Sequence, residues 1–278
     1  ATILRSDDFS WDVNVNYFTN KTVVNEIGAG LTEITLFSTG EYGIFAVEGE
    51  QFPLIKASSY YRDPNGNIVV NPNTGNPIST TERDGTLKEL GTTVPDYVIG
   101  LNSSVNYKDF RLAATFDYRT GHVYYAQGSD AMEFTGRSKE SVSAIRQDFI
   151  IPNSVIETSP GVFVENTSLP VTNGNQDYWT NTYNEIKENY VRDATAVKLR
   201  EIALSYNLPA KFLDKTPLQI VSVGLVGRNL FTWLPEENRF SDPEFSNNNG
   251  PAGNGIGIGG YFQGPPTRSY GLNVNIEF

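Results

Sequence analysis

The sequence contains no cysteine, and its 278 residues include one histidine and one methionine. Without cysteine the chain forms no disulfide, offers no thiol nucleophile and holds no cysteine-ligated metal. The single histidine, His122, has no nucleophile and no second ligand beside it in the sequence, so we interpret it as a residue at the base of a loop. No catalytic residue, cofactor or metal ion is predicted, and an enzyme is the least favoured class of protein.

Long hydrophobic runs and basic clusters are also missing. No run of about 18 apolar residues occurs, which excludes a membrane-spanning helix. A membrane β-barrel is compatible with the hydrophobic content of 38% and the mean hydropathy of -0.34, because a barrel strand shows lipid only every second residue. The formal charge of -11 and the lack of a basic patch argue against nucleic acid as a partner.

The most informative segment is residues 267–278, which read T-R-S-Y-G-L-N-V-N-I-E-F. Apolar or aromatic side chains alternate there with small or polar ones. This period of two predicts a β-strand with one apolar and one polar face. An outer-membrane barrel uses such a strand to close against an earlier one and so leaves no edge. Phe278 is therefore predicted to take part in barrel closure and to act as a C-terminal signal.

Six further segments are predicted as strands. They are residues 9–19, 22–36, 97–107, 110–118, 195–208 and 218–233, of which 22–36 alternates least clearly. Between 195 and 208 the apolar phase changes, so a β-bulge near Arg200 and Glu201 is predicted. Short connections alternate with long ones at 37–96, 120–194 and 234–266, which is typical of outer-membrane barrels. Seven strands are an odd number and too few to close, which favours one part of a larger barrel.

Charged side chains within the strands indicate which face lines the lumen. Arg111, Asp117 and Arg119 have the phase opposite to the apolar residues of their strand. A lysine or arginine facing lipid at the bilayer midplane costs about 2–4 kcal/mol, so these three residues are predicted to face the lumen. Contact with a plug domain is favoured over contact with substrate.

The aromatic residues, 12% of the chain, fall into two groups. One group lies at strand ends with the lipid-facing phase and is predicted to form interface girdles: Trp11, Tyr17, Tyr97, Tyr107, Phe110, Tyr206, Phe231 and Phe278. The other lies in the long connections and supplies the candidate ligand-binding residues: Tyr60, Tyr61, Tyr124, Tyr125, Tyr178, Trp179, Tyr261 and Phe262. Flat rings stack on sugars or on apolar peptide side chains, and packing against a partner protein explains these residues equally well.

Two other motifs are interpreted without a ligand. Oxygen-rich segments beginning at Asp63 and Asp242 lack the spacing of an EF-hand, and D-P-N-G at residues 63–66 is interpreted first as a turn set by proline and glycine. The glycine-rich run at residues 253–260 carries no lysine and opens no helix, so it is interpreted as an extracellular loop and not as a phosphate-binding loop.

Several motifs in order carry a family resemblance. Residues 191–209 read V-R-D-A-T-A-V-K-L-R-E-I-A-L-S-Y-N-L-P, followed by V-G-L-V-G-R-N-L-F-T-W at 223–233 and F-S-D-P-E-F-S at 240–246. Upstream are Y-Y-R-D-P-N-G-N-I-V-V at 60–70, L-G-T-T-V-P-D-Y at 90–97, Y-K-D-F-R-L at 107–112, F-T-G-R-S at 134–138 and R-x-D-F-I-I-P-N at 146–153. Together they resemble the C-terminal segment of SusC/RagA-type TonB-linked outer-membrane transporters over nearly all of the chain.

The resemblance implies an all-β fold, an antiparallel transmembrane barrel of about 22 strands with long extracellular loops. Residues 1–278 would supply its last seven strands, with the plug and the TonB-interacting segment outside them. It implies TonB-energised import of oligosaccharides or oligopeptides across the outer membrane. The implied partners are a SusD-like surface lipoprotein, the TonB complex, the rest of the barrel and plug, and membrane lipid with lipopolysaccharide. No signal peptide precedes Ala1, so an exported protein is expected to be matured or to have a further N-terminal portion.

Two alternatives stay open. Another outer-membrane β-barrel, such as a porin or a secretion-associated barrel, would fit the strands but not the ordered motifs. A soluble β-sandwich that binds glycans or acts as an adhesin would need the apolar strand faces to meet in a core, and it would be soluble without detergent.

Overall fold

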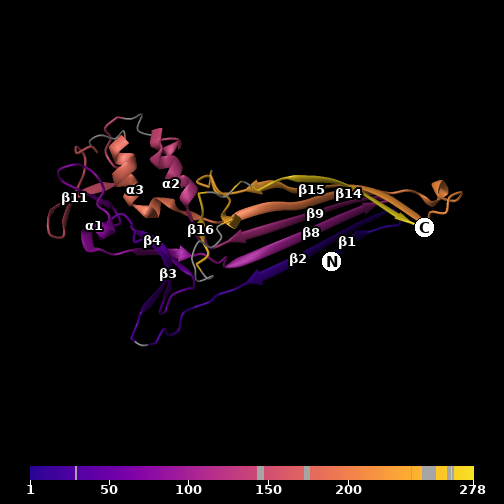
Figure 1. Cartoon of the computed structure of the whole chain (residues 1–278), viewed down its shortest axis with the longest axis horizontal. Coiled ribbons are helices and arrows are strands. Elements are labelled where there is room, and N and C mark those ends of the chain that lie inside the picture. The colour runs from indigo at the N-terminus through magenta and orange to yellow at the C-terminus, as the bar shows by residue number, and fades with distance from the viewer. Residues whose placement is uncertain are drawn as a thin grey trace.

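The computed structural model describes residues 1–28, 30–142, 147–171, 176–238, 240–245, 255–261, 264 and 266–278. It has two parts, a long sheet and a folded head at one end of it (Figure 1). The structure is mostly antiparallel β-sheet with few and short helices. The predicted all-β fold is confirmed at this level.

The long sheet has seven strands in the order β1-β2-β8-β9-β14-β15-β17, each antiparallel to its neighbours. They are β1 (Thr2–Arg5), β2 (Phe9–Thr19), β8 (Tyr97–Tyr107), β9 (Phe110–Thr120), β14 (Ala196–Asn207), β15 (Ile220–Trp233) and β17 (Ser269–Glu277). Neighbouring strands follow one another along the chain, so the sheet is a meander. Between β8 and β9 the turn is tight, and Lys108 adopts the positive φ of 52° that such a hairpin requires.

Six of the seven predicted strands are confirmed in this sheet, and one is wrong. Residues 22–36 do not cross the sheet; their end belongs to β3 (Glu33–Ser38), which pairs in the head. The seventh strand is β1, which sequence reasoning missed because four residues are too few to display a period of two.

The register aligns apolar residues across neighbouring strands. One row crosses five of the seven strands, running from Val15 through Leu101, Phe116 and Leu199 to Phe231 as successive cross-strand partners. The predicted bulge is confirmed, because pairing on both sides of β14 shifts between Leu199 and Glu201. The extra residue restores the phase, so the apolar side chains of β14 stay on one face along its length.

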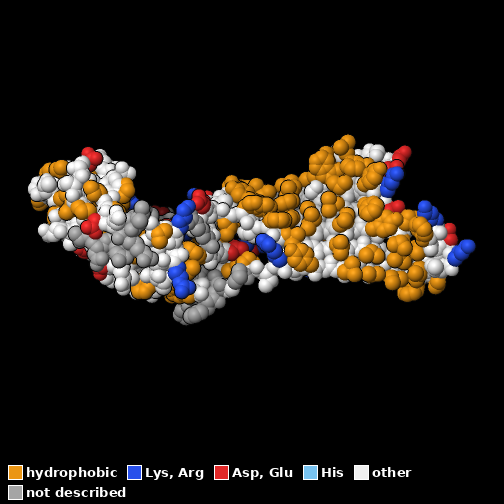
Figure 2. All heavy atoms as spheres, turned by 90° about the horizontal axis from the view of Figure 1, so that it is seen from above, with side chains coloured by type: hydrophobic (Ala, Val, Ile, Leu, Met, Phe, Trp, Pro, Cys, Tyr) orange, Lys and Arg blue, Asp and Glu red, His pale blue; other side chains and the backbone are white. Residues whose placement is uncertain are grey.

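This apolar face is open in the described part of the chain. Leu225 is 61% exposed, Leu272 is 65% exposed and Tyr270 is 77% exposed. Figure 2 shows hydrophobic side chains gathered over the long sheet. The other described sheets belong to the head, and none of them shares a strand with the long sheet or forms a second sandwich layer on this face. Soluble proteins rarely expose so continuous an apolar surface, which argues against the soluble sandwich.

The head contains three small sheets, in the orders β3-β4-β5-β7, β13-β10-β16 and β12-β11-β6. Their remaining strands are β4 (Tyr42–Val47), β5 (Leu54–Ala57), β6 (Ile68–Val70), β7 (Lys88–Thr92), β10 (Val123–Ala126), β11 (Ser154–Ser159), β12 (Val162–Glu165), β13 (Val191–Asp193) and β16 (Ile258–Gly259). Two pairings are parallel, β10 with β16 and β11 with β6, so they join segments far apart in the sequence. The connections between the long strands are therefore folded together and are not independent loops.

The helical elements of the described residues are short. They are α1 (Thr80–Asp84), α2 (Gln127–Phe134), α3 (Tyr183–Glu185), the π-helical turn η2 (Tyr178–Thr182), and the 3₁₀ turns η1 (Glu140–Val142), η3 (Lys187–Tyr190), η4 (Ala210–Phe212) and η5 (Pro243–Phe245). α1 begins at a Ser79 cap, whose hydroxyl accepts a hydrogen bond from the Glu82 N–H. No helix in this part of the chain has the length and apolar character needed to cross a membrane.

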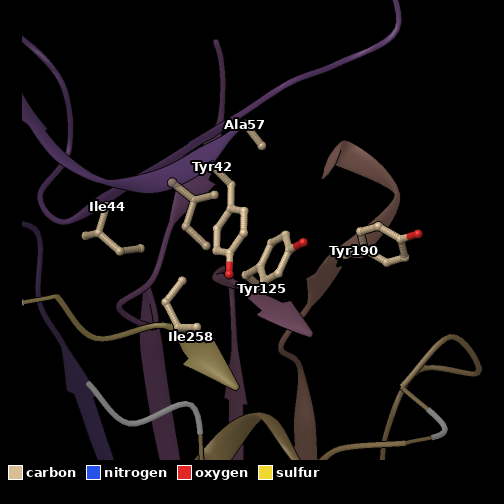
Figure 3. Close-up of a cluster of buried hydrophobic side chains, with 7 residues drawn as sticks. Tyr42, Ile44, Ala57, Tyr125, Tyr190 and Ile258 are labelled. Atoms are coloured by element: carbon tan, nitrogen blue, oxygen red, sulfur yellow. The ribbon is translucent and has the colours of Figure 1, made fainter. Parts of the chain in front are cut away.

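Three buried clusters occur among the described residues, and the two larger ones form most of the core of the head. The first joins strands β4, β5, β10 and β16 with η3 (Figure 3), and its members are Tyr42, Ile44, Ile55, Ala57, Tyr125, Tyr190 and Ile258. The rings of Tyr42 and Tyr125 are stacked, with centroids 3.7 Å apart. The second consists of Val70, Ile151, Val171, Tyr178 and Trp179. These clusters give the head a hydrophobic core of its own.

Candidate functional site

Opposite the apolar face, the long sheet presents small and polar side chains. Asn106 Nδ2 donates to Ser10 Oγ at 2.9 Å, and Thr115 Oγ1 donates to Asn102 Oδ1 at 2.9 Å. A shallow cavity of about 470 Å³ lies on this polar face, and its lining includes Arg111. The alternation of the strands thus separates an apolar face from a polar face that is able to contact polar partners or solutes.

Six charged side chains meet on the polar face near the head. Three are cations from β9 and β14, and three are carboxylates from β9 and the segment after β15: Arg119, Lys198, Arg200, Asp117, Asp242 and Glu244. We call this set the ion cluster. Its formal charge is balanced, with three positive and three negative groups.

Glu244 is the central acceptor of the ion cluster. Arg200 donates to both of its carboxylate oxygens, at 2.7 and 2.6 Å, and Lys198 Nζ donates to Oε2 at 2.6 Å. Arg119 Nη2 lies 3.2 Å from Oε1. Burial alone would raise the pKa of Glu244, but the hydrogen bonds and charges of Arg200 and Lys198 outweigh it and lower the pKa to about 2. Glu244 is therefore ionised at neutral pH.

The sequence F-S-D-P-E-F at residues 240–245 explains how Glu244 reaches the polar face of the long sheet. Asp242 Oδ1 accepts the backbone N–H of Glu244 at 3.0 Å, which supports the short turn η5. The second oxygen of Asp242 accepts from Lys198 Nζ at 2.6 Å, and both side chains are 5% exposed. Phe245 places its ring 5.8 Å from the same ammonium group. The turn is thus fixed to the polar face by an ion pair, a capping bond and a cation–π contact.

The structure brings together two of the three residues predicted to face a lumen. Asp117 and Arg119 belong to the ion cluster, whereas Arg111 lies apart from them in the shallow cavity. All three lie on the polar face, and that this face lines a lumen stays a prediction. Sequence reasoning missed the pairing of Lys198 and Arg200 with the segment after β15. The available hint was an acidic turn with two carboxylates, Asp242 and Glu244, together with two cations two residues apart on one strand, Lys198 and Arg200.

Four of the eight candidate ligand-binding aromatics are core residues, which corrects their placement in open loops. Tyr125 is 0% exposed, Tyr124 is 1%, Tyr178 is 4% and Trp179 is 7%. Tyr124 and Tyr125 belong to β10, in the middle of a head sheet. The ring faces of these four residues are largely occupied by neighbouring side chains, because the head has a core that sequence reasoning did not foresee.

The remaining candidates lie nearer the surface. Tyr60 and Tyr61 are half-buried, and the Tyr60 hydroxyl donates to Asn189 Oδ1 at 2.9 Å. Tyr261 is 50% exposed. Phe262 lies outside the described residues. Phe278 is 79% exposed and follows the last residue of β17, so its part in barrel closure stays a prediction.

The glycine-rich run at residues 253–260 is partly a strand. Ile258 and Gly259 form β16, and Ile258 is 0% exposed. Its interpretation as a loop is wrong at these two positions, because they pair with β10 inside the head. Residues 253 and 254 of the run lie outside the described residues. Asp63 accepts hydrogen bonds from the N–H groups of Asn65 and Asn67, as expected of a turn. The described residues contain no group of three or more candidate metal ligands.

Two titratable groups lie inside the head and near its base. Burial raises the pKa of Glu133 to about 7, although Arg192, with its Nη2 at 3.1 Å, opposes the shift. Burial also lowers the pKa of His122 to about 4, so this side chain is neutral at pH 7.

A long antiparallel sheet with one apolar and one polar face, carrying a folded head, is the architecture expected of one side of an outer-membrane receptor. No protein-family model matches the chain. Two curated proteins of Formosa agariphila are similar to it. TonB-dependent receptor P3 is 26% identical over 307 residues, covering 99% of this chain and 27% of the receptor. TonB-dependent receptor P26 is 24% identical over 302 residues, covering 100% and 28%.

Solved structures agree with this likeness at the level of the fold. The RagAB peptide transporter matches with a TM-score of 0.63 at 16% identity, covering 99% of this chain and 28% of the transporter chain. The RagAB peptide importer in its open-open state gives 0.62 at 17% identity. The predicted resemblance to SusC/RagA-type TonB-linked receptors is confirmed. The chain spans about a quarter of the length of the curated relatives that it matches.

Proposed function

We propose that this chain forms part of an outer-membrane receptor that imports nutrients with energy supplied through TonB. Residues 1–278 would be the C-terminal portion of the barrel domain, with the plug and the TonB-interacting segment outside this portion. The observation that carries the proposal is the long sheet itself, with its apolar face exposed and its polar face holding the ion cluster. The names of the curated relatives support it.

The dimensions of the sheet fit a bilayer. Strand β8 runs from Tyr97 to Tyr107, which at about 3.3 Å per residue corresponds to about 33 Å along the strand. A barrel strand tilts by about 40°, so this length covers about 25 Å of membrane height, the thickness of the apolar band of outer-membrane barrels. Aromatic side chains occur at both ends of the sheet, as interface girdles require: Tyr17, Tyr97 and Tyr118 near the head and Tyr107, Phe110 and Tyr206 near the turns.

The free edges of the sheet favour a larger barrel. β1 and β17 each pair with one strand among the described residues. An unpaired edge within lipid leaves backbone N–H and C=O groups without partners, so membrane sheets close. We propose that further strands complete a barrel of about 22 strands, with the polar face turned to its lumen and Arg111, Asp117 and Arg119 toward the plug.

For the ligand, we propose an oligosaccharide or an oligopeptide, captured under the head with the help of a SusD-like surface lipoprotein. The structural neighbours named above are described as a peptide transporter and a peptide importer. Tyr60, Tyr61 and Tyr261 are the candidate aromatics that keep part of their surface accessible. Membrane lipid and lipopolysaccharide would surround the apolar face.

A porin or a secretion-associated barrel would share the same sheet, so the test must concern energy coupling. We would measure where the full-length protein resides and whether a strain that depends on it takes up labelled oligosaccharides or peptides with and without TonB. We expect the protein to reside in the outer membrane. We also expect uptake to be lost when either the gene for this receptor or the gene for TonB is deleted. Uptake that persists without TonB would indicate a passive barrel and contradict the proposal.

A further inference from the structure

The connection between β2 and β4 forms an arm that extends past the edge of the long sheet. We define the arm as residues 22–28 and 30–38, which include β3 at its end. In Figure 1 the arm descends past β2 and away from β14 and β15, so it lies on the side of the sheet where β1 is the last described strand. None of its residues lines the shallow cavity of the polar face or belongs to the ion cluster.

We infer that the arm is a docking surface for the receptor's own chain, for the head-side connection that directly precedes residue 1. The inference rests on the proposed function, in which further barrel strands precede this portion of the receptor. Three observations carry it. They are the unpaired part of β2, the free edge of β3 and the exposed apolar side chains of the arm.

The unpaired part of β2 indicates where the preceding chain runs. β1 pairs with β2 only as far as Asp12 and Val13, whereas β8 pairs with β2 along its whole length to Thr19. Residues 14–19 therefore have one free edge among the described residues, and a membrane sheet does not leave such an edge open to lipid. Because β1 is antiparallel to β2, the chain before Ala1 would continue along these residues toward the head. At about 3.3 Å per residue it covers about 20 Å and arrives where the arm begins.

β3 supplies a second free edge on the same side of the molecule (Figure 1). It is the outermost strand of the head sheet β3-β4-β5-β7, and it pairs only with β4 among the described residues. Proteins commonly block such edges with prolines or charged side chains. β3 contains no proline, and its one ionised residue, Glu33, forms an ion pair with Lys56 of β5. The edge is thus able to accept a further strand through main-chain hydrogen bonds.

The arm also exposes apolar side chains near this edge. Leu31 is 53% exposed, Ile34 is 43% exposed and Val23 is 39% exposed. Single exposed apolar residues are ordinary on protein surfaces, but these three lie on one short segment. Lipid does not cover them, because the arm begins beyond the head end of β2. The chain that continues β1 reaches the head at this place, so it is the occupant that the geometry favours.

Both ends of the arm are fixed to the rest of the head. The Val24 N–H donates to the Glu50 carbonyl at 3.0 Å, and the Gly49 N–H donates to the Val24 carbonyl at 2.8 Å. At the other end, Leu36 and Phe37 pack against the first buried cluster of the head. A surface that is already held in one conformation loses less entropy when a partner docks on it. The arm is therefore suited to a stable contact.

The test uses the purified full-length receptor in detergent, without a lipoprotein partner and with any other cysteine of the receptor replaced. L31C and I34C report on the arm, and V162C is the matched control, because Val162 is 51% exposed on β12 in another sheet of the head. The rate of reaction with a water-soluble maleimide is compared with the rate of the same variant in urea. We expect L31C and I34C to react at least tenfold more slowly than V162C. The measurement is repeated with a SusD-like lipoprotein bound.

Photo-crosslinking identifies what covers the arm. Asn25, an exposed residue of the arm, is replaced by the photo-reactive residue p-benzoylphenylalanine in the same full-length receptor. Crosslinked peptides are identified by mass spectrometry. We expect links to receptor peptides that precede Ala1, formed without the lipoprotein.

The inference is overturned if L31C and I34C react within tenfold of V162C, if they are protected only when the lipoprotein is bound, or if no link to a peptide preceding Ala1 is found. TonB-dependent uptake by the unmodified receptor is measured separately. Missing protection with intact uptake contradicts the docking surface alone. Protection of the arm in a receptor whose uptake does not need TonB contradicts the import function alone.

Discussion

At the scale of single residues, Glu244 shows how one carboxylate fixes a connection to a sheet. It accepts from Arg200 and Lys198 and lies beside Arg119, while 25% of its side chain remains exposed. Removing one member of such a cluster leaves cations without compensation, which costs more than the pair itself contributes. The effect of a substitution should therefore exceed that of an ordinary surface ion pair.

We predict that E244Q lowers the free energy of unfolding of the receptor by about 2 kcal/mol, below the roughly 3–5 kcal/mol of fully buried pairs because Glu244 is partly exposed. The control is E201Q, which removes an exposed pair with Arg228 and should cost less than about 1 kcal/mol. Denaturant unfolding followed by tryptophan fluorescence measures both. Equal effects of the two substitutions would show that the ion cluster does not anchor the segment.

The ionisation of Glu244 also sets a pH dependence. Its folded pKa of about 2 lies below the ordinary value of 4.5, so its contribution is complete above about pH 4.5 and is lost as the pH falls toward 2. The stability difference between the unmodified protein and E244Q should therefore shrink between pH 5 and pH 2. A difference that stays constant over this interval would contradict the assignment.

The contribution of Glu133 to stability depends on pH in the opposite direction. Its folded pKa of about 7 lies above 4.5, so the native head binds this proton more tightly, and stability from this group is lost as the pH rises from about 4.5 to 7. We predict that hydrogen exchange of the head becomes faster between pH 5 and pH 8, after correction for intrinsic exchange, and that E133Q reduces this change. An unchanged pH dependence in E133Q would contradict the prediction.

At the scale of elements, the head and the sheet depend on different contacts. Tyr125 is fully buried, stacks on Tyr42 and meets Tyr190 edge to face, so it connects β10 with β4 and η3. Removing a buried aromatic side chain costs about 3–5 kcal/mol. The long sheet makes none of these contacts and should be affected much less.

We therefore predict that Y125A opens the head locally while the sheet stays intact. Limited proteolysis should cut within residues 40–60 and 123–130 much faster than in the unmodified protein, whereas peptides of β8 and β9 remain protected. F212A, at a residue that is 63% exposed in the turn η4 between β14 and β15, serves as control and should change neither region. Cooperative loss of head and sheet together in Y125A would show that they are one folding unit.

The two faces of β17 allow a matched comparison of adjacent residues. Leu272 pairs with Leu225 on the apolar face, and Asn273 pairs with Gly224 on the polar face. We predict that L272R lowers stability in lipid bilayers by about 2–4 kcal/mol, because arginine then faces hydrocarbon. N273R should cost much less, since its neighbour is a glycine on the polar face. Reversible folding into vesicles measures both, and equal costs would contradict the assignment of the faces.

The sequence predicted the long strands well and the head poorly, for physical reasons. Strands β2 and β8 each have eleven residues that alternate between a lipid-compatible and a polar face, so their ends are evident. The head is built from strands of two to six residues, several buried on both sides, and from parallel pairs such as β6 with β11. Such strands display no alternation, and their partners lie far away in the sequence.

The candidate site was predictable in part for similar reasons. Arg119 and Asp117 could be assigned to the polar face from their phase alone, but their link to Glu244 depends on how a long connection folds back. An aromatic residue that binds a ligand and one that packs in a core also have the same local sequence. Tyr124 and Tyr125 were therefore indistinguishable from Tyr261 until the fold was known.

At the scale of the whole molecule, the central claim is that the long sheet is a wall between lipid and an aqueous lumen. The chain contains no cysteine, so single cysteines introduced at residues 270–276 of β17 report their surroundings without background from this segment. The experiment uses the full-length receptor in outer membranes and a water-soluble maleimide. Residue by residue, it distinguishes side chains in water from side chains in hydrocarbon.

We expect the labelling along β17 to alternate with a period of two. Cysteines replacing Gly271, Asn273 and Asn275 should react with the maleimide, and those replacing Leu272, Val274 and Ile276 should be protected until detergent dissolves the membrane. Uniform labelling of both sets in intact outer membranes, or protection with the opposite phase, would contradict the claim that the apolar face of this sheet contacts lipid.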